Sequence, residues 1–209
     1  EYACNYNEEA NINNESCEYS CYDNGDYSLS FDEEGNYIDL GVVGNYSSKI
    51  TVAAWINSTD IEGYSYWNDI IGGSPGDIYF AIKDDKLAFC GQNGDPFNCI
   101  TLSTTSLNDN GWHHVAATYD EDGGTNNLKI YIDGVLENQT TTLGSFTPSN
   151  LRVGSHYENS EGEFYIGDIS EIILWNETLT SAQINLLYNN QSFDIQEGLL
   201  AYYKFTQGP

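Results

Sequence analysis

The sequence predicts an all-β fold, a sandwich of antiparallel sheets with one short helix near the C-terminus. Short runs of alternating apolar and polar residues recur along most of the chain, which is the period of strands with two differently solvated faces. Turns rich in glycine, asparagine and aspartate separate these runs. The length of 209 residues suits a single core, because all-β sandwiches of this size commonly form one domain.

The clearest strand signal lies in the stretch 111–140, GWHHVAATYDEDGGTNNLKIYIDGVLENQT. Alternation over residues 113–119 and 128–132 predicts two strands, and the turn-forming residues between them predict a hairpin. The pair Asp133-Gly134 predicts a second reversal, because glycine adopts positive φ without a Cβ clash and aspartate tolerates it. Residues 135–137 should therefore fold back on the strand before them.

Similar runs predict further strands before and after this hairpin. They lie at residues 27–31, 37–40, 50–56, 70–72, 78–82, 86–90, 150–154, 164–175 and 199–205. Residues 178–187 predict the helix, since Ser181 or Thr180 can cap its first turn. Three apolar residues of this segment are expected to lie against a sheet: Leu179, Ile184 and Leu187.

The phrase WHHVAATYD, a polar loop and LKIYIDG resemble, in order and spacing, the central signature of the laminin-G-like (concanavalin A-like lectin-glucanase) jelly-roll domains. Three other phrases are similar to that family: SLSFDEEGNYIDLG, with Glu33 where glycine is usual, TVAAWIN and FYIGDISEIILW. The resemblance covers residues 26 to about 205 and implies a two-sheet antiparallel jelly roll. It also implies that Trp112 opens a strand of one sheet while the Asp133-Gly134 turn caps a hairpin of the other.

The phrase GLLAYYKFT, which in this family usually begins a domain, here ends the chain. One face of the strand at 199–205 is too apolar to remain in solvent, so the strand must pair. Two partners are open. The strand either joins its own sandwich as a permuted edge, which is favoured because the termini of this fold lie close together, or adds to a neighbouring copy. Exchange between copies would build a filament.

Residues 1–25 form a separate segment, rich in asparagine, glutamate and cysteine and too poor in aliphatic residues to build a core. The run from Cys4 to Cys17 resembles cysteine-bounded segments of the type ACNYNPEA…DGSC, which lie between domains of large secreted surface proteins. Two hypotheses stay open: a loop stapled by a Cys4–Cys17 disulfide, or a loop whose side-chain oxygens wrap a calcium ion. We therefore divide the chain into this cysteine-rich segment and a jelly-roll domain at 26–209.

The five cysteines have no His/Cys spacing suited to zinc and predict disulfides formed in an oxidising compartment. Cys90 and Cys99 flank GQNGDPFN, which glycine and proline can turn, so a local disulfide worth roughly 2–3 kcal/mol is expected. Cys21 is left to pair outside this chain or to stay free. Six sequons agree with export and permit glycosylation, at Asn14, Asn45, Asn57, Asn138, Asn176 and Asn190.

Net charge and hydropathy limit the classes of partner that the chain is expected to bind. Six Lys and Arg against 32 Asp and Glu give a net charge of −26, which disfavours nucleic acid and anionic membranes because phosphate binding draws on Lys and Arg. No apolar run approaches the roughly 18 residues of a membrane helix, and the first residues lack the pattern of a signal peptide. We expect a processed, secreted or cell-surface protein without membrane insertion.

Catalytic motifs are absent from the sequence, and we expect no enzyme. It has no G-x-S-x-G elbow, H-E-x-x-H helix or phosphate-cradling glycine loop, and no E-x-D-x-x-E strand of the kind found in the related-fold β-glucanases. His113 and His114 are neighbours on a strand, so they point to opposite faces and cannot chelate one metal together. We expect them to pack or to hydrogen-bond.

Two candidate sites remain. In the loop between Cys90 and Cys99, a sugar could stack on one aromatic ring and hydrogen-bond to its polar neighbours, through Asn93, Asp95 and Phe97. The family resemblance implies a calcium ion near the rim of the sandwich, held by Asp32 and Asp168, with Asn36 as a third ligand. The alternative is that Asp168 caps a turn and Asp32 is solvated.

The predicted function is therefore an extracellular, non-catalytic binding or adhesion module. It would recognise a glycan or a protein at its loop rim, with calcium as a candidate cofactor. The alternative is a structural subunit of an extracellular filament or surface appendage, assembled through the strand at 199–205 or through the N-terminal segment.

Overall fold

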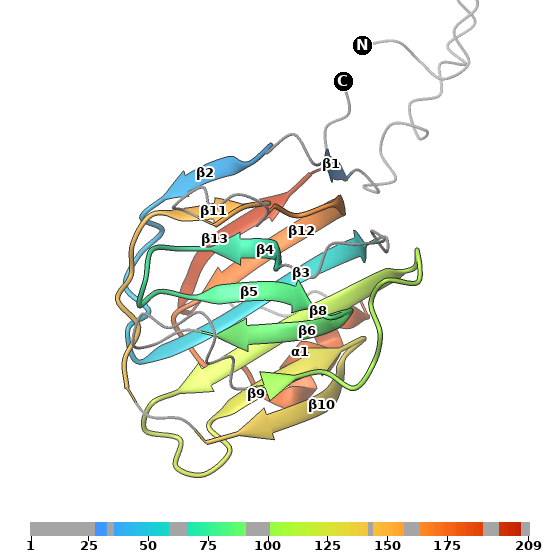
Figure 1. Ribbon diagram of the computed structural model, residues 1–209. Helices are drawn as coiled ribbons and strands as arrows, with labels where there is room; N and C mark the ends of the chain where they lie inside the picture. Colours follow the sequence, from blue (N-terminus) through green and yellow to red (C-terminus); the bar gives the residue numbers. More distant parts are fainter. Residues whose placement is uncertain are drawn as a thin grey trace, which may run out of the picture.

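The computed structural model describes residues 28–32, 36–58, 67–90, 101–141, 144–156, 164–189 and 197–205. They form two antiparallel sheets packed face to face, with one short helix outside the sandwich, as the sequence predicts (Figure 1). Within the described residues, no helix is both long enough and apolar enough to cross a membrane.

The strands divide into a sheet A and a sheet B. Sheet A has the order β1 (Leu29–Phe31), β12 (Gly167–Trp175), β3 (Lys49–Ser58), β8 (Trp112–Asp120), β9 (Leu128–Ile132) and β10 (Val135–Thr140), and β13 (Leu199–Lys204) also pairs with β12. Sheet B has the order β2 (Ile38–Gly41), β11 (Leu151–Val153), β4 (Asn68–Gly72), β5 (Tyr79–Lys83), β6 (Lys86–Cys90) and β7 (Thr101–Leu102).

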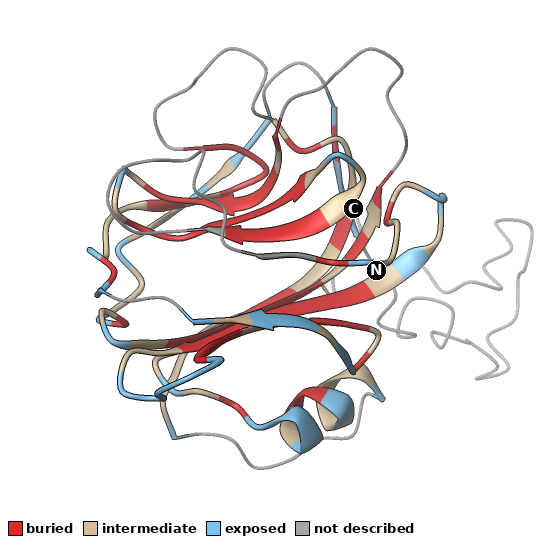
Figure 2. Ribbon diagram, turned by 60° about the horizontal axis from the view of Figure 1, so that its bottom comes forward, coloured by how far each residue is buried: buried red, intermediate tan, exposed pale blue. Residues whose placement is uncertain are grey.

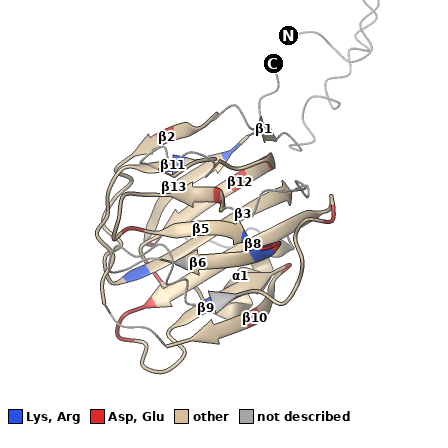
Figure 3. Cartoon of the chain, in the orientation of Figure 1, with Lys and Arg blue, Asp and Glu red and all other residues tan. Residues whose placement is uncertain are grey.

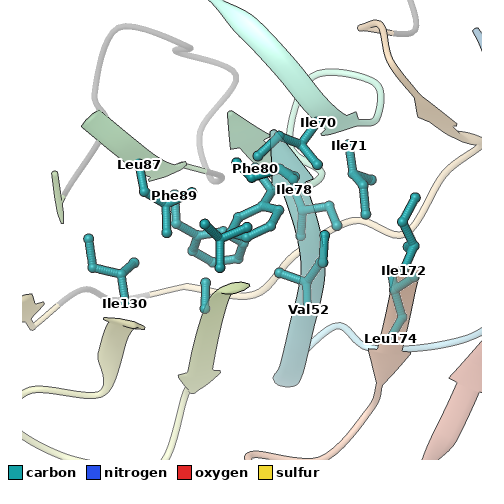
Figure 4. Packing of buried hydrophobic residues seen from close by; sticks show 14 of the residues in the cluster. Val52, Ile70, Ile71, Ile78, Phe80, Leu87, Phe89, Ile130, Ile172 and Leu174 are labelled. Atoms are coloured by element: carbon teal, nitrogen blue, oxygen red, sulfur yellow. The ribbon is translucent and has the colours of Figure 1, made fainter. Parts of the chain in front are cut away.

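The main core lies between the two sheets. Every second residue of the central strands points inward, so Val52, Ile172 and Leu174 of sheet A face Phe80 and Phe89 of sheet B (Figure 4). The two phenylalanine rings meet edge to face, with centroids 6.2 Å apart. This continuous apolar layer fixes the register of both sheets, because a slip by one residue would turn these side chains to the outside.

The central hairpin forms as predicted, but its place differs from the family expectation. Strands β8, β9 and β10 pair in sequence, and the turn between the last two has φ 50° at Asp133 and φ 75° at Gly134. Two consecutive positive φ values match the right-handed twist of a two-residue hairpin. All three strands belong to sheet A. The expectation that Trp112 and the Asp133-Gly134 turn lie in different sheets is therefore wrong.

The two ends of the domain meet on one strand. Along the outer edge of β12, β13 pairs with residues Glu171–Trp175 and β1 pairs with Gly167–Ile169, so the last and first described strands lie end to end. This confirms that the strand at 199–205 joins its own sandwich. The next strand, β2, belongs to sheet B rather than beside β1, so the short connection between them crosses from one sheet to the other.

The helix α1 (Ser181–Tyr188) lies on the outer face of sheet A, the face turned away from sheet B (Figure 2). Thr180 is its N-cap, and a reciprocal pair of hydrogen bonds with Gln183 forms a capping box. Leu179 and Ile184 are buried against the sheet and Leu187 packs beside them, as predicted. The helix builds a second, smaller core with Ala53, Ala116, Tyr131, Ile173 and Trp175 of the strands below it.

Charged side chains are placed at the margins of the sandwich. Figure 3 shows acidic residues mainly at strand ends and turns, with few Lys and Arg, of which Lys83 and Lys86 lie opposite each other across one turn. Lys49, for example, lies 3.8 Å from both Asp120 and Glu177, where strands β3 and β8 meet the segment before the helix. The two sheet interiors are therefore apolar, and the polar chemistry lies at the ends and on the outer faces.

Candidate functional site

The predicted calcium residues and the base of the predicted ligand loop are at opposite ends of the sandwich. Asp32 follows β1, whose partner Gly167 begins β12 beside the end of β3 at Ser58. Cys90, at the base of the loop, ends β6 opposite Tyr79, the first residue of β5, at the far end of sheet B.

The three calcium candidates are grouped at one corner of sheet A. The side-chain amide of Asn36 donates to Asp32 Oδ1 over 2.8 Å. Ser30 is directly opposite Asp168 in the pairing of β1 with β12, and Asp32 is two residues beyond Ser30. Asp32 is exposed and Asp168 is half-buried. Two carboxylates and an amide from two chain segments supply the oxygen atoms that calcium prefers.

The predicted ligand loop lies outside the described residues, with Asn93, Asp95 and Phe97. Its flanking strands are described. β6 and β7 pair antiparallel, with Phe89 opposite Thr101, so the segment between them begins and ends side by side. Cys90 and Cys99 stand one and two residues beyond that pair, which suits the predicted disulfide. Cys4, Cys17 and Cys99 lie outside the described part of the chain, so both pairings stay predictions.

The adjacent histidines take opposite sides of sheet A, as expected. His113 Nδ1 lies 2.9 Å from Asp133 Oδ2 and its Nε2 lies 3.3 Å from Asp109 Oδ1. Burial alone would lower the pKa of His113, but the two carboxylates outweigh burial and raise it. His114 is buried between the rings of Trp55 and Tyr188, and burial lowers its pKa to about 4. These roles are structural, and neither ring is placed to hold a metal with the other.

The carboxylate of Asp77, two residues before β5, is fully engaged by hydrogen bonds within the fold. Its carboxylate accepts from the Tyr46 hydroxyl over 2.8 Å, from the Ile78 amide, and from both the amide and the hydroxyl of Ser149 over 2.7 Å. Burial raises the pKa of Asp77, and these hydrogen bonds oppose that change. Across the described residues, no group of three or more His, Cys, Asp or Glu side chains is arranged to hold a metal.

The outer face of sheet B carries a group that the sequence analysis missed. The indole of Trp67 meets the Tyr79 ring edge to face at 6.2 Å, and the Tyr79 ring lies 4.4 Å from the His156 ring. Lys83 Nζ lies 4.5 Å above the Trp67 ring, and Asp69, fully buried, stands opposite Ala81 on the same face. We call these five residues, Trp67, Asp69, Tyr79, Lys83 and His156, the sheet B cluster.

The residues of the sheet B cluster lie next to the ends of three segments that are outside the described residues. The segment 59–66 ends at Trp67, the segment 91–100 follows the strand paired with Tyr79, and the segment 157–163 follows His156. The alternation of residues 78–82 could have indicated that Tyr79 and Ala81 face outward. The sequence could not have indicated that Trp67 and His156 both lie beside Tyr79, because only the order of the strands in the sheet brings them there.

Four of the predicted sequon asparagines are described. Asn45 and Asn138 are exposed, and Asn138 sits at a bulge of the edge strand β10. Asn57 lies within the paired strand β3 and donates to the Asn110 carbonyl over 3.3 Å, while Asn176 is half-buried. Asn45 and Asn138 are thus the more exposed of the four, and Asn14 and Asn190 lie outside the described residues.

The fold defines a class: a two-sheet antiparallel jelly-roll sandwich. A family model described as the concanavalin A-like lectin/glucanases superfamily (Laminin_G_3) matches residues 32–185. The chain belongs to this family.

Similar proteins extend this assignment. The chain is 30% identical over 202 residues to the Sushi, von Willebrand factor type A, EGF and pentraxin domain-containing protein 1 of Mus musculus; the match covers 87% of this chain and 5% of that protein. Among solved structures, a candidate carbohydrate-binding protein from Bacteroides ovatus has a TM-score of 0.64 and 27% identity, over 85% of this chain and 50% of the other. A heptameric SAP-like pentraxin from Limulus polyphemus has a TM-score of 0.58 and 14% identity, over 76% and 80%, and supports the fold alone.

Proposed function

We propose that this chain is an extracellular, non-catalytic binding module that recognises a glycan or a protein through the loops rooted in sheet B. The observation that carries this proposal is the sheet B cluster, from which three loop segments start or end. Binding loops are commonly held on a rigid scaffold, and the buried side chains of Trp67, Tyr79 and His156 would supply that scaffold. The likeness to a candidate carbohydrate-binding protein at 27% identity supports the glycan.

A glycan array tests this role. We expect the wild-type chain to bind a subset of glycans and Phe97→Ala, in the loop after β6, to lose at least tenfold in affinity. Val42→Ala, which shortens a side chain that is 64% exposed on the connection after β2, is the matched control and should bind like wild type. Silence across the array, together with no captured extracellular protein, would contradict the proposal.

Calcium belongs to the proposal as a rim ion held by Asp32, Asn36 and Asp168, tying β1 to β12. An ion bound only to the folded state must stabilise it, so calcium should raise the melting temperature and EDTA should lower it. Asp32→Asn should remove that response. Asp39→Asn, at an exposed aspartate of β2, should keep it. If the wild-type melting temperature ignores EDTA, these three residues hold no calcium.

The alternative function is that of a filament subunit assembled through the strand at 199–205. The observed pairing of this strand argues against that route of assembly. β13 is paired along one edge with β12 of the same chain, so strand exchange between copies would first have to break this pairing. Assembly through the N-terminal segment remains a hypothesis. Size-exclusion chromatography of the purified chain separates the two, since a filament subunit elutes as an assembly that grows with concentration.

A further inference from the structure

The outer face of sheet A is only partly covered by α1. Where the helix ends, outward-facing residues of four strands remain open to solvent. In one row, Asp168 is paired with Asn57 and Asn57 with Trp112; in the next, Glu171 is paired with Trp55. Residues directly opposite each other in a sheet project to the same side. These side chains therefore share one surface.

Two of the aromatic rings on this surface are unusually exposed. Trp112 is 42% exposed at the start of β8, and Tyr202 is 50% exposed on β13, opposite Ile173. Trp55 lies between them in the sheet. We call Trp55, Trp112, Tyr202 and Glu171 the aromatic platform. Exposed rings cost solvation free energy, so two of them on one face, with the half-buried Trp55 between them, indicate a surface that meets a ligand.

The aromatic platform is held rigid before any ligand arrives. Trp55 stacks on Tyr188 of α1 with centroids 5.7 Å apart and planes 25° apart, and it meets His114 edge to face at 5.4 Å. The Tyr202 hydroxyl hydrogen-bonds to Glu171, and burial together with this carboxylate raises the pKa of Tyr202. Side chains fixed in this way lose little conformational entropy on binding.

The dimensions suit an extended ligand. Tyr202 and Trp112 are three strands apart and four residues apart along the strand direction, which at standard spacings is about 14 Å in each direction, or about 20 Å along the diagonal. Trp55 and Glu171 lie along that diagonal. A diagonal of three rings with one carboxylate acceptor matches a chain of several pyranose rings, whose faces are apolar and whose edges carry hydroxyl donors.

Charge selects among glycans. The acceptor on the platform, Glu171, is a carboxylate, and the whole chain carries a net charge of −26, so sialylated or sulfated chains would be repelled. We propose that the aromatic platform is a second glycan-binding surface, on the face of the sandwich opposite to sheet B, for neutral oligosaccharides of about four units. It needs no metal and is independent of the loops rooted in sheet B.

The test is isothermal titration calorimetry, supported by tryptophan fluorescence, with neutral oligosaccharides of glucose, N-acetylglucosamine, mannose and galactose, four to six units long. Protein made in bacteria is used so that Asn57, a sequon residue in the same row, carries no glycan. We expect at least one neutral series to bind, with Trp112→Ala and Tyr202→Ala each losing at least tenfold in affinity. Tyr37→Ala, at a 44% exposed ring on sheet B, is the matched control and should bind like wild type.

Separate readouts distinguish this surface from the proposed sheet B function. Binding at the platform should persist in EDTA and in Phe97→Ala, and sialylated or sulfated analogues should bind more weakly. Circular dichroism of Trp112→Ala confirms that the fold is kept. If no neutral series binds, or if Trp112→Ala and Tyr202→Ala bind like wild type, the platform is not a glycan surface, whatever the sheet B loops do.

Discussion

The outer faces of sheet A and sheet B differ in what covers them. Sheet A is covered over part of its area by α1, which seals small and apolar residues such as Ala53, Ala116 and Ile173 into a second core. Sheet B has no helix over it in the part of the chain that the structure describes, and its outer face carries the ring pair Tyr79–His156. The comparison teaches that cover decides exposure: Tyr131 and Trp175 are buried under the helix, whereas Trp112 and Tyr202, on the same face beyond the helix, are 42% and 50% exposed.

The strongest test of this comparison removes the contact of the helix with sheet A. Ile184→Ala should cost about 3 kcal/mol of unfolding free energy, because Ile184 is fully buried in the second core and truncation leaves a cavity. Urea denaturation followed by circular dichroism measures it. Leu187→Ala, at a half-buried site of the same helix, is the control and should cost distinctly less. A loss below about 1 kcal/mol for Ile184→Ala would show that the helix does not contribute a core.

A second test concerns the link between the two sheets. Glu137 of β10 accepts hydrogen bonds from Thr104 and Thr105, just after β7, including 3.0 Å from the Thr104 amide and 2.9 Å from the Thr105 hydroxyl. Glu137→Ala should cost about 1–2 kcal/mol at neutral pH. Glu197→Ala, at an exposed glutamate, should change little.

The pH dependence of this link has a defined sign. Burial alone would raise the pKa of Glu137, but the hydrogen bonds outweigh burial and lower it. Its contribution to stability is therefore present above the unfolded pKa and is lost as pH falls through the lowered folded pKa. Urea unfolding at pH 7 and at pH 3 should show the difference between wild type and Glu137→Ala shrinking at the lower pH. A difference that is constant over this range would contradict the account.

The adjacent histidines lie on opposite sides of sheet A, and their contributions to stability should depend on pH in opposite directions. Because the pKa of His113 is raised, its contribution is full below the unfolded value and is lost as pH rises through the folded value. The pKa of His114 is lowered to about 4, so its neutral form stabilises above the unfolded value of about 6.5, and that stability is lost as pH falls toward 4. His113→Gln should therefore cost more at pH 6 than at pH 8.5, by on the order of 1 kcal/mol.

His114→Gln gives the opposite profile and serves as the comparison for His113→Gln. Relative to wild type, its unfolding free energy should improve as pH falls from 6.5 to 4, because the variant has no imidazole to protonate in a buried site. Thermal unfolding across this pH range measures both variants. Parallel pH profiles for the two variants would mean that the two rings share one environment, which the structure contradicts.

The smallest effect is expected at the corner where sheet A meets the segment before α1. Lys49 is half-exposed and 3.8 Å from its two carboxylate partners, so solvent and salt screen the pairs. Lys49→Gln should change the unfolding free energy by about 0.5 kcal/mol or less, and the change should vanish in high salt. A larger loss that is insensitive to salt would place this residue in the packing of the corner.

Much of the fold could be predicted from the sequence, because alternation marks each strand and Asp133-Gly134 marks a tight turn. The assignment of strands to sheets could not. The local sequence pattern does not show that β1 and β2 belong to different sheets, because a turn of a few residues can either close a hairpin or cross between sheets.

The sites were less predictable than the strands for the same reason. Trp67 and His156 both contact Tyr79, and they do so only because β4, β5 and β11 belong to one sheet. In β12, a register shift between Ile169 and Glu171 places Glu171, rather than Ser170, opposite Trp55. Strict alternation from Asp168 would have given the reverse, so a bulge decided one member of the aromatic platform.

The central claim is that two regions bind ligands: the part of the outer face of sheet A that α1 leaves exposed, and the loops rooted in sheet B. Hydroxyl-radical footprinting with mass spectrometry, on the chain with and without a bound neutral oligosaccharide, tests it most directly. We predict that Trp112 and Tyr202 become protected, in the presence or absence of EDTA, while the residues under α1 stay unchanged. Unchanged labelling of both rings at saturating oligosaccharide would contradict the claim for sheet A and leave recognition to the loops of sheet B.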